Sequence, residues 1–275
     1  MANGDLNLNR LLEILGYETR DLIKEVQSEL KQYGYEIITD NDNYVVGVPA
    51  TWESEYNPSL AFVAHMDTIH RTHVRLKVHN ARIHNDDAVL GADDRAGVFA
   101  ILEMLKTAEY KPLIIFTNYE ETCGRGVKAL VQSKKLDPYV EKIALFIEPD
   151  RKGFKEYVYY SHSLPQKIAD FAAKFNFHKE HGSYSDVCDL TKAYRIPHLN
   201  LSVGYMWQHT RQEFLDLIDL KFTMRAMCRM LITKPPKRVL MTEEEVSGPK
   251  YVAPARQNNN HWGNNSSNNN VSGKR

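Results

Sequence analysis

The chain has 275 residues, of which 43% are hydrophobic, and its 35 lysines and arginines balance its 35 aspartates and glutamates. A chain of this length has enough surface to bury one large core or two small ones. Nucleic acids and anionic membranes attract basic proteins, so a formal net charge of zero argues against either as a partner.

The cysteine content and the N-terminus indicate the compartment. Cys123, Cys188 and Cys228 are few and widely spaced, which argues against a disulfide framework and favours a reducing environment. The first 20 residues lack the apolar centre of a signal peptide, and no apolar run approaches the roughly 20 residues that span a bilayer. We therefore predict a cytoplasmic protein.

The first half of the chain alternates amphipathic segments with short apolar runs. Apolar residues recur at three- and four-residue steps in residues 8–15 and 21–33, a pattern typical of helices. Bounded runs rich in β-branched or aromatic residues are typical of buried strands. Such runs predict strands at residues 44–48, 60–64, 113–116 and 143–147.

The alternation continues to residue 231. Helical patterns occupy residues 95–105, 126–131 and 165–175, with Pro165 suited to a first helical position. A strand at 199–203 precedes a closing helix at 217–231. Alternation of this kind predicts an α/β fold, a three-layer sandwich around a central mixed, mainly parallel sheet.

The composition changes near residue 234. Prolines and an acidic triplet follow, and asparagine dominates residues 257–272. A stretch this polar cannot bury enough apolar surface to offset the entropy lost on ordering. We predict a catalytic domain over residues 1–233 and a flexible, asparagine-rich tail over 234–275.

Polar residues follow the predicted strands, where ligands bind in parallel α/β sheets. His65 and Asp67 come directly after the strand at 60–64 and, being two residues apart, share one face. The imidazole suits zinc, and the carboxylate can orient it. Taken alone, the pair also fits a histidine that is merely hydrogen-bonded.

Two adjacent aspartates precede the helix at 95–105. Asp93 and Asp94 could cap that helix and complement its dipole. Asp93 could instead bridge two cations, one through each oxygen, because a dication removes the repulsion between neighbouring carboxylates.

Two adjacent glutamates follow the strand at 113–116. If Glu121 binds metal, Glu120 stays free to move a proton, since a metal-bound carboxylate is a poor base. Cys123 is better explained as a small buried hydrophobe than as a soft ligand, because carboxylate-rich sites rarely use a thiolate.

The last two candidates follow the strands at 143–147 and 199–203. Either Glu148 or Asp150 could serve as a terminal ligand, and His209 supplies a second imidazole at the same sheet edge. Four other histidines alternate with apolar residues, as in an exposed pair of strands, and are interpreted as surface residues: His70, His73, His79 and His84.

These motifs in this order resemble the co-catalytic dizinc exopeptidases. The order is His-x-Asp, Gly-Ala-Asp-Asp-Arg-Ala-Gly, Glu-Glu, an acid after a strand and a distant histidine. That superfamily includes peptidase T, glutamyl aminopeptidases, carboxypeptidase G-type enzymes and succinyl-diaminopimelate desuccinylase. The resemblance covers residues from about 60 to 220.

The resemblance implies a role for each residue. Asp93, two residues before Arg95, would bridge two metal ions, and Glu120 would be the general base. Peptidase T-like members favour Asp150 as a ligand, whereas desuccinylase-like members carry a Glu-Pro pair and would favour Glu148. Residues 182–186 resemble a small-residue loop that borders the pocket. The implied set is His65, Asp93, Glu121, Asp150 and His209 for two Zn²⁺, with Co²⁺ or Mn²⁺ as substitutes, plus Asp67 behind His65.

The implied function is hydrolysis of peptide bonds in small peptides, foremost by an aminopeptidase. The alternatives are a deacylase of N-acyl amino acids and a non-catalytic binding protein on the same scaffold. Many relatives insert a second domain between the post-strand acid and the final histidine. The interval from Asp150 to His209 leaves no room for one, so the sequence predicts a form without a lid domain and leaves its oligomeric state open.

Overall fold

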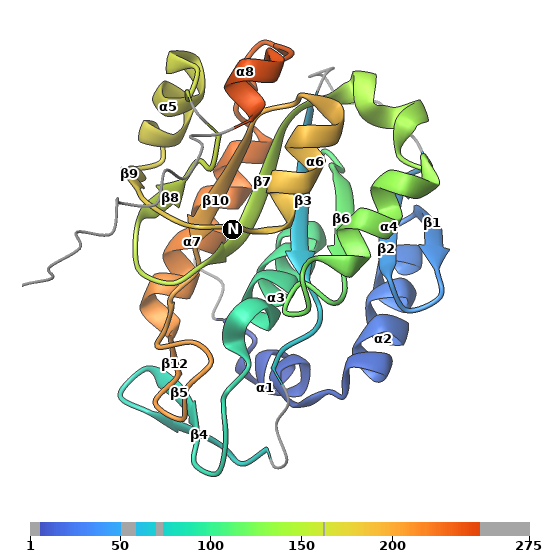
Figure 1. Cartoon of the computed structure of the whole chain (residues 1–275). Helices are drawn as coiled ribbons and strands as arrows, with labels where there is room; N and C mark the ends of the chain where they lie inside the picture. Colours follow the sequence, from blue (N-terminus) through green and yellow to red (C-terminus); the bar gives the residue numbers. More distant parts are fainter. Residues whose placement is uncertain (1–5, 51–58, 70–73, 162, 248–275) are drawn as a thin grey trace, which may run out of the picture.

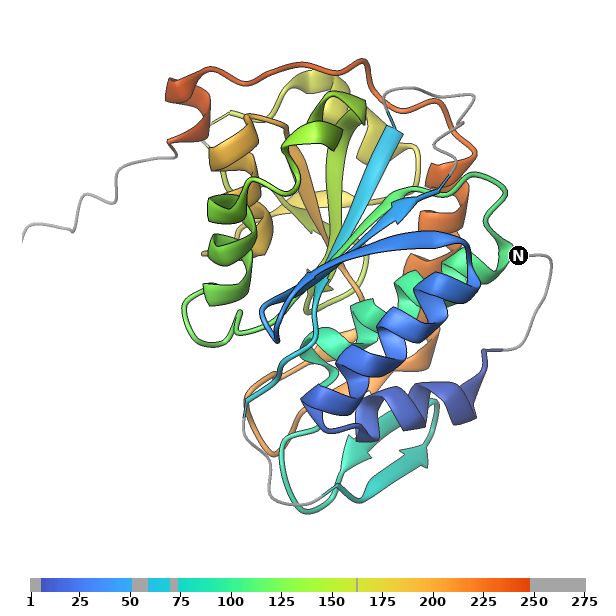
Figure 2. The same ribbon diagram turned by 90° about the vertical axis from the view of Figure 1, so that its right-hand side faces the viewer.

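A central sheet lies between two layers of helices (Figures 1 and 2). The computed structural model describes residues 6–50, 59–69, 74–161 and 163–247. The sheet has eight strands, which in spatial order are β1 (Tyr35–Asp40), β2 (Tyr44–Pro49), β6 (Leu113–Thr117), β3 (Ser59–His65), β7 (Ile143–Arg151), β10 (His198–Ser202), β8 (Glu156–Val158) and β9 (His178–Glu180).

The middle of the sheet is parallel. β6, β3, β7 and β10 run in the same direction, whereas β2 joins β6 and β8 joins β10 in antiparallel fashion. Every residue of β3, β6 and β10 is buried, because helices cover both faces. The predicted α/β sandwich with a mixed, mainly parallel sheet is thereby confirmed.

Figure 2 shows the sheet nearly edge-on, with helices on either side. One face packs against α1 (Leu8–Gly16), α2 (Thr19–Gln32), α3 (Ala92–Thr107), α5 (Gln166–Ala173) and α7 (Leu217–Leu231). The other packs against α4 (Arg125–Ser133), the short 3-10 helix η1 (Asp137–Lys142) and α6 (Asp186–Tyr194).

Helix α3 lies unusually close to β7. A Cβ atom on Gly97 would lie 2.6 Å from the carbonyl oxygen of Pro149, so only glycine permits this approach. Two residues before Gly97, the buried guanidinium of Arg95 donates to the carbonyl oxygens of Leu15 at 3.2 Å and of Tyr17. These contacts fix α3 between β7 and the N-terminal helices.

A smaller antiparallel sheet lies beside the start of α3, at the lower end of Figure 1. Its strands, in order, are β11 (Tyr205–Met206), β12 (Phe214–Asp216), β5 (Arg82–Asn85) and β4 (Leu76–His79). The predicted histidine-rich strand pair corresponds to β4 and β5. His79 is exposed and His84 half-buried, whereas His70 and His73 lie outside the described residues.

Strand β7 is longer than the sequence predicts. It continues to Arg151, so Glu148 and Asp150 lie within the strand rather than after it. Pro149 donates no hydrogen bond, and it sits where the pairing with β10 shifts register, between Asn200 and Ser202. Strand β1 and helix α6 are not among the predicted elements, and Pro165 precedes α5 as its cap instead of occupying its first turn.

The segment after α7 follows the surface of the domain. Met241 is buried, and its backbone amide donates to the carbonyl oxygen of Arg195 at 2.8 Å. A short helix, α8 (Glu243–Val246), begins with a capping box between Thr242 and Glu245. Residues 248–275, with the asparagine-rich stretch, lie outside the described residues, and the division at residue 233 stays a prediction.

No inserted domain separates Asp150 from His209 within the described chain; that interval holds only β8, α5, β9, α6, β10 and β11. None of the helices in the described ranges is both long and apolar enough to cross a bilayer. The cytoplasmic location stays a prediction from the sequence.

Candidate active site

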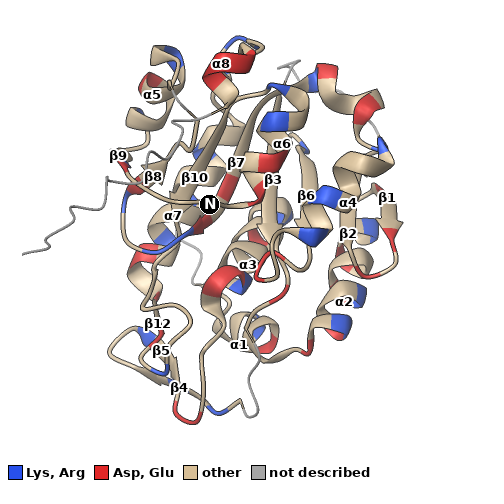
Figure 3. Cartoon of the chain, in the orientation of Figure 1, with Lys and Arg blue, Asp and Glu red and all other residues tan. Residues whose placement is uncertain are grey.

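Acidic and imidazole side chains meet at the carboxyl ends of the central strands. In Figure 3 red segments gather where β3, β6 and β7 end and where α3 begins. Parallel strands end at one edge of the sheet, which brings residues far apart in sequence together. The loop between β11 and β12 adds His209.

The first group of donor atoms contains His65, Asp93 and Asp150. His65 ends β3 and is fully buried, with Nε2 3.1 Å from Asp93 Oδ1 and 3.6 Å from Asp150 Oδ1. Burial opposes a charge on the imidazole, but Asp150, Asp67 and Asp93 together raise the pKa of His65 well above its usual value.

The second group contains Asp93, Glu121 and His209. His209 Nε2 lies 3.3 Å from Asp93 Oδ2 and 2.7 Å from Glu121 Oε1. Hydrogen bonds with Asp93 and Glu121 raise the pKa of His209 to about 10. Asp93 therefore belongs to both groups and presents a different oxygen to each.

Asp67 lies behind the first group. Its Oδ1 atom is 3.4 Å from His65 Nδ1 and accepts a hydrogen bond from the amide of Glu120 at 3.1 Å, and its Oδ2 atom accepts one from the amide of Glu121 at 3.2 Å. Burial alone would raise the pKa of Asp67, but His65 and these amides lower it. One carboxylate thus orients both the histidine and the Glu-Glu turn.

Glu120 is half-buried and lines the cavity next to Asp93. A carboxylate oxygen of Glu120 also lies within 4.8 Å of donor atoms of His65 and Glu121. Burial, reinforced by the negative charges of Asp186 and Glu121, raises the pKa of Glu120 to about 7. Such a group can take up and release a proton near neutral pH.

Asp150 and Glu148 have different surroundings. Asp150 accepts hydrogen bonds from Tyr205 Oη at 3.1 Å and Ser185 Oγ at 3.2 Å, and burial raises its pKa to about 7. Glu148 is fully buried and accepts a hydrogen bond from Ser185, but it belongs to none of the donor groups found among the described residues.

Three further candidates lie outside these groups. Asp94 accepts a hydrogen bond from the amide of Gly97 at 3.0 Å, so it caps α3, and its peptide bond to Asp93 is cis. Asp186 is buried and accepts a hydrogen bond from the hydroxyl of Thr117, whereas residues 182–184 of the same loop line the cavity. Cys123 is exposed, which corrects the prediction of a buried hydrophobe; it lies in a surface turn with φ of 66°.

Glu213 is a residue that sequence reasoning missed. Its buried carboxylate accepts hydrogen bonds from the amides of Gly91 at 2.9 Å, Ala92 at 2.8 Å and Asp93 at 3.3 Å. It therefore fixes the turn that carries Asp93. No sequence signal marks it, because its partners are backbone groups that every residue has.

The donor set fits divalent cations. Several carboxylates are crowded into a buried space without a lysine or arginine bonded to them, and the fully buried oxygens Asp94 Oδ2, Glu148 Oε1 and Asp186 Oδ1 have no hydrogen-bond partner within the described chain. Imidazole nitrogen and carboxylate oxygen are common zinc ligands. Two cations would offset the repulsion between these carboxylates.

A cavity of about 360 Å³ opens above the two groups. Its lining residues are Asp93, Glu120, Asp150, Arg151, Lys152, Tyr160, His181, Gly182, Ser183, Tyr184, Tyr205, Gln208 and His209. This volume suits a small ligand of a few residues rather than a folded protein.

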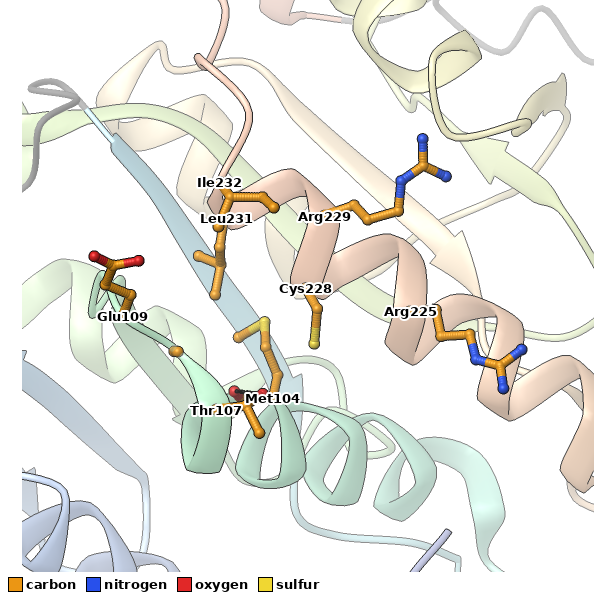
Figure 4. A pocket seen from close by; sticks show the side chains of 9 residues that line it. Met104, Thr107, Glu109, Arg225, Cys228, Arg229, Leu231 and Ile232 are labelled. Carbon is orange, nitrogen blue, oxygen red and sulfur yellow. Dashed lines mark hydrogen bonds between the residues drawn. The ribbon is translucent and has the colours of Figure 1, made fainter. Parts of the chain in front are cut away.

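Another cavity, of about 290 Å³, lies between α3 and α7 (Figure 4). Met104 from α3 and Cys228 from α7 both turn into it, and Arg225 and Arg229 extend from the outer side of α7. None of its lining residues belongs to the donor groups. The candidate active site is therefore the cavity at the carboxyl ends of the strands.

Solved structures share this fold. The chain is similar to the aminopeptidase PepT from Bacillus cereus (15% identity, TM-score 0.65, covering 87% of this chain and 98% of that one). It is also similar to a tripeptidase from Staphylococcus aureus (15% identity, TM-score 0.67, covering 82% of this chain and 96% of that one). A third similar structure is the TET1 peptidase of Pyrococcus horikoshii (16% identity, TM-score 0.59, covering 82% of this chain and 99% of that one), described as assembling into a tetrahedron or a large octahedral shell.

The sequence comparisons identify the family. No curated protein sequence gives a significant match to the chain. The model of peptidase family M28 matches residues 47–227, well over half of the chain, and this range holds both donor groups, Asp67 and Glu120. The resemblance to the co-catalytic zinc exopeptidases is thereby confirmed: the chain is a peptidase and belongs to peptidase family M28.

Proposed function

We propose that this protein is a dizinc aminopeptidase that acts on short peptides. The observation that carries the proposal is the position of Asp93, whose two oxygens lie beside different imidazoles, 3.1 Å from His65 and 3.3 Å from His209. A carboxylate shared in this way suits two cations held side by side.

One zinc ion would be held by His65, Asp150 and Asp93, and the other by Glu121, His209 and Asp93. We choose Asp150 over Glu148 because Asp150 faces His65 at 3.6 Å, whereas Glu148 belongs to none of the donor groups among the described residues. Bound zinc supplies Lewis-acid chemistry, which lowers the pKa of water and polarises a carbonyl group. Co²⁺ or Mn²⁺ can replace it on the same ligands.

Glu120 is the general base in this proposal. It lines the cavity and is placed in neither of the two ligand sets, so its carboxylate stays free to accept a proton. It removes the proton from the attacking water and passes it to the leaving amine. Asp67 is a positioning residue, because it holds the ring of His65 and the backbone of the Glu-Glu turn.

Short peptides are the proposed substrates. The cavity has about 360 Å³, and the described chain has no lid domain that would enlarge or close it. The relatives in fold named above are an aminopeptidase, a tripeptidase and a peptidase, which supports an exopeptidase over a deacylase of N-acyl amino acids.

The test compares aminoacyl-arylamides with N-acyl amino acids as substrates of the zinc-loaded protein. We expect turnover of the arylamides, and a variant Glu120→Gln that keeps its zinc but loses roughly 10²- to 10⁴-fold in kcat. Preferred cleavage of N-acyl amino acids would assign the protein to the deacylases. Full activity of the zinc-loaded Glu120→Gln variant would remove Glu120 from the mechanism.

A further inference from the structure

One side of the cavity is basic, although the donor groups beside it are acidic. Arg151, Lys152 and His181 line the same cavity as Asp93 and Glu120. Arg151 and Lys152 directly follow Asp150 at the end of β7, and His181 directly follows β9. We call Arg151, Lys152 and His181 the basic side of the cavity.

The side chain of Arg151 forms no ion pair with the residues that the structure describes. No carboxylate oxygen of the described residues lies within 4.0 Å of its guanidinium nitrogens, although Asp150 and Glu148 are near in sequence. Its Nε atom is buried and has no hydrogen-bond partner there either. A buried donor without an acceptor is costly, so this guanidinium is suited to an anion that comes from outside the described chain.

The basic side is held in place by the backbone. The carbonyl oxygens of Arg151 and Lys152 accept hydrogen bonds from Val203 N and Ser202 Oγ, both at 2.9 Å. His181 sits on a loop that passes close to β8, because a Cβ atom on the neighbouring Gly182 would lie only 2.9 Å from Val158 Cγ1.

The wall of the cavity that contains Tyr160 is also fixed. A Cβ atom on Gly182 would also lie 2.8 Å from the ring of Tyr160. Tyr160 in turn accepts a hydrogen bond from Asn200 Nδ2 at 3.0 Å and stacks on His198 with ring centroids 5.6 Å apart. The backbone that carries the basic side is therefore fixed, which reduces the entropy lost when a ligand binds.

The charge balance also favours an anion. Two Zn²⁺ ions would carry four positive charges, which the carboxylates of Asp93, Glu121, Asp150 and Asp67 would neutralise. Arg151 and Lys152 add positive charge within the same cavity. These two side chains therefore favour a negatively charged group on the substrate.

We propose that Arg151, with Lys152 and His181, binds a carboxylate of the substrate and makes the enzyme prefer acidic short peptides. The proposal rests on the proposed peptidase function and specifies its substrate class. Arginine pairs with a carboxylate through two parallel hydrogen bonds, which fixes the orientation of the substrate as well as adding affinity.

The carboxylate can come from two sources, namely a glutamate side chain at the N-terminus of the peptide or the C-terminal α-carboxylate of a dipeptide. Three probes distinguish them. Glutamyl-glycinamide carries only the side-chain carboxylate, glutaminyl-glycine carries only the α-carboxylate, and glutaminyl-glycinamide carries neither.

The experiment measures binding of each probe by isothermal titration to the zinc-loaded Glu120→Gln protein, and kcat/KM of each with the active enzyme. We expect one of the two acidic probes to bind roughly 10- to 100-fold more tightly than the neutral probe, the range for one charge-assisted pair. The probe that gains identifies the source of the carboxylate.

Arg151→Met should abolish this preference, so that the acidic and the neutral probes bind with equal affinity. Lys179→Met is the matched control, because Lys179 is an exposed cation on β9 that does not line the cavity. If Arg151→Met fails to fold, Lys152→Met and His181→Asn take its place, and each should reduce the preference.

Equal binding of all three probes would overturn the proposal, and so would an acidic preference that survives Arg151→Met. Loss of the preference in Lys179→Met as well would attribute it to the overall charge of the protein and would also overturn the proposal. Binding of an acidic probe without turnover of any peptide by the active enzyme would instead reject the peptidase function and keep the carboxylate subsite.

Discussion

Replacing Glu213 should weaken both the fold and the metal centre, although Glu213 belongs to neither donor group. Its side chain is 1% exposed and accepts the amide hydrogens of Gly91, Ala92 and Asp93 at 2.8–3.3 Å. Glu213→Ala removes the acceptor and leaves three backbone N–H groups without a partner in a buried turn.

The expected loss follows from this count. An unsatisfied buried donor costs about 1–3 kcal/mol, so three give roughly 3–9 kcal/mol before the turn relaxes or water enters. Single substitutions rarely exceed about 4–5 kcal/mol, and we therefore expect a loss of about 3–5 kcal/mol in the free energy of unfolding. Glu213→Gln keeps one acceptor oxygen and should lose about 1–2 kcal/mol.

Urea unfolding of the metal-free protein measures the stability, and a zinc titration of the folded variant measures the metal affinity. Because Asp93 loses its support, we expect zinc to bind roughly 10- to 100-fold more weakly. Gln212→Ala, an exposed neighbour, is the control. Wild-type stability and wild-type zinc affinity in Glu213→Ala would refute the reasoning, since the three hydrogen bonds would then contribute nothing.

Three other substitutions test further contacts. Burial lowers the pKa of His198 to about 3, so below pH 6.5 the unfolded state binds a proton that the folded state does not. The contribution of His198 to stability should fall by about 1.4 kcal/mol for each unit by which the pH drops between about 6.5 and 3, and urea unfolding of His198→Gln should differ from the wild type by this slope; equal slopes would contradict this. Gly97→Ala places a Cβ atom 2.6 Å from the carbonyl of Pro149 and should cost about 1–3 kcal/mol in the same assay, whereas an unchanged urea midpoint would mean that α3 can move away freely. Arg95→Met removes the donor to Leu15 and should lower the thermal midpoint by several degrees; we expect Arg20→Met, at an exposed ion pair with Asp42, to shift it less.

Much of the fold is predictable because its strands are completely buried. β3 and β6 are covered on both faces and therefore read as unbroken apolar runs of ordinary strand length. Strand β1 lies at the sheet edge, and Tyr35 is the one buried residue among its six, which makes it hard to separate from the end of the preceding helix. Strand β8 has three residues, and most of its definition comes from pairing with β10.

The site is predictable to a similar degree. Because parallel strands end at one edge, residues after β3 and β6 had to lie near one another, and His65, Asp93, Glu121, Asp150 and His209 do lie together. The sequence does not say which carboxylate oxygen faces which imidazole. It also does not reveal contacts made through backbone amides, such as those of Glu213, or that Arg151 forms no ion pair within the described part of the chain.

The pairing of the two donor groups through Asp93 is the central claim. The most direct measurement is a zinc-soaked crystal with anomalous diffraction recorded at the zinc absorption edge. We predict two zinc peaks, one beside His65 and Asp150 and the other beside Glu121 and His209, with Asp93 in contact with both. A single peak, or ligand side chains that point away from the metal, would contradict the proposed dizinc centre.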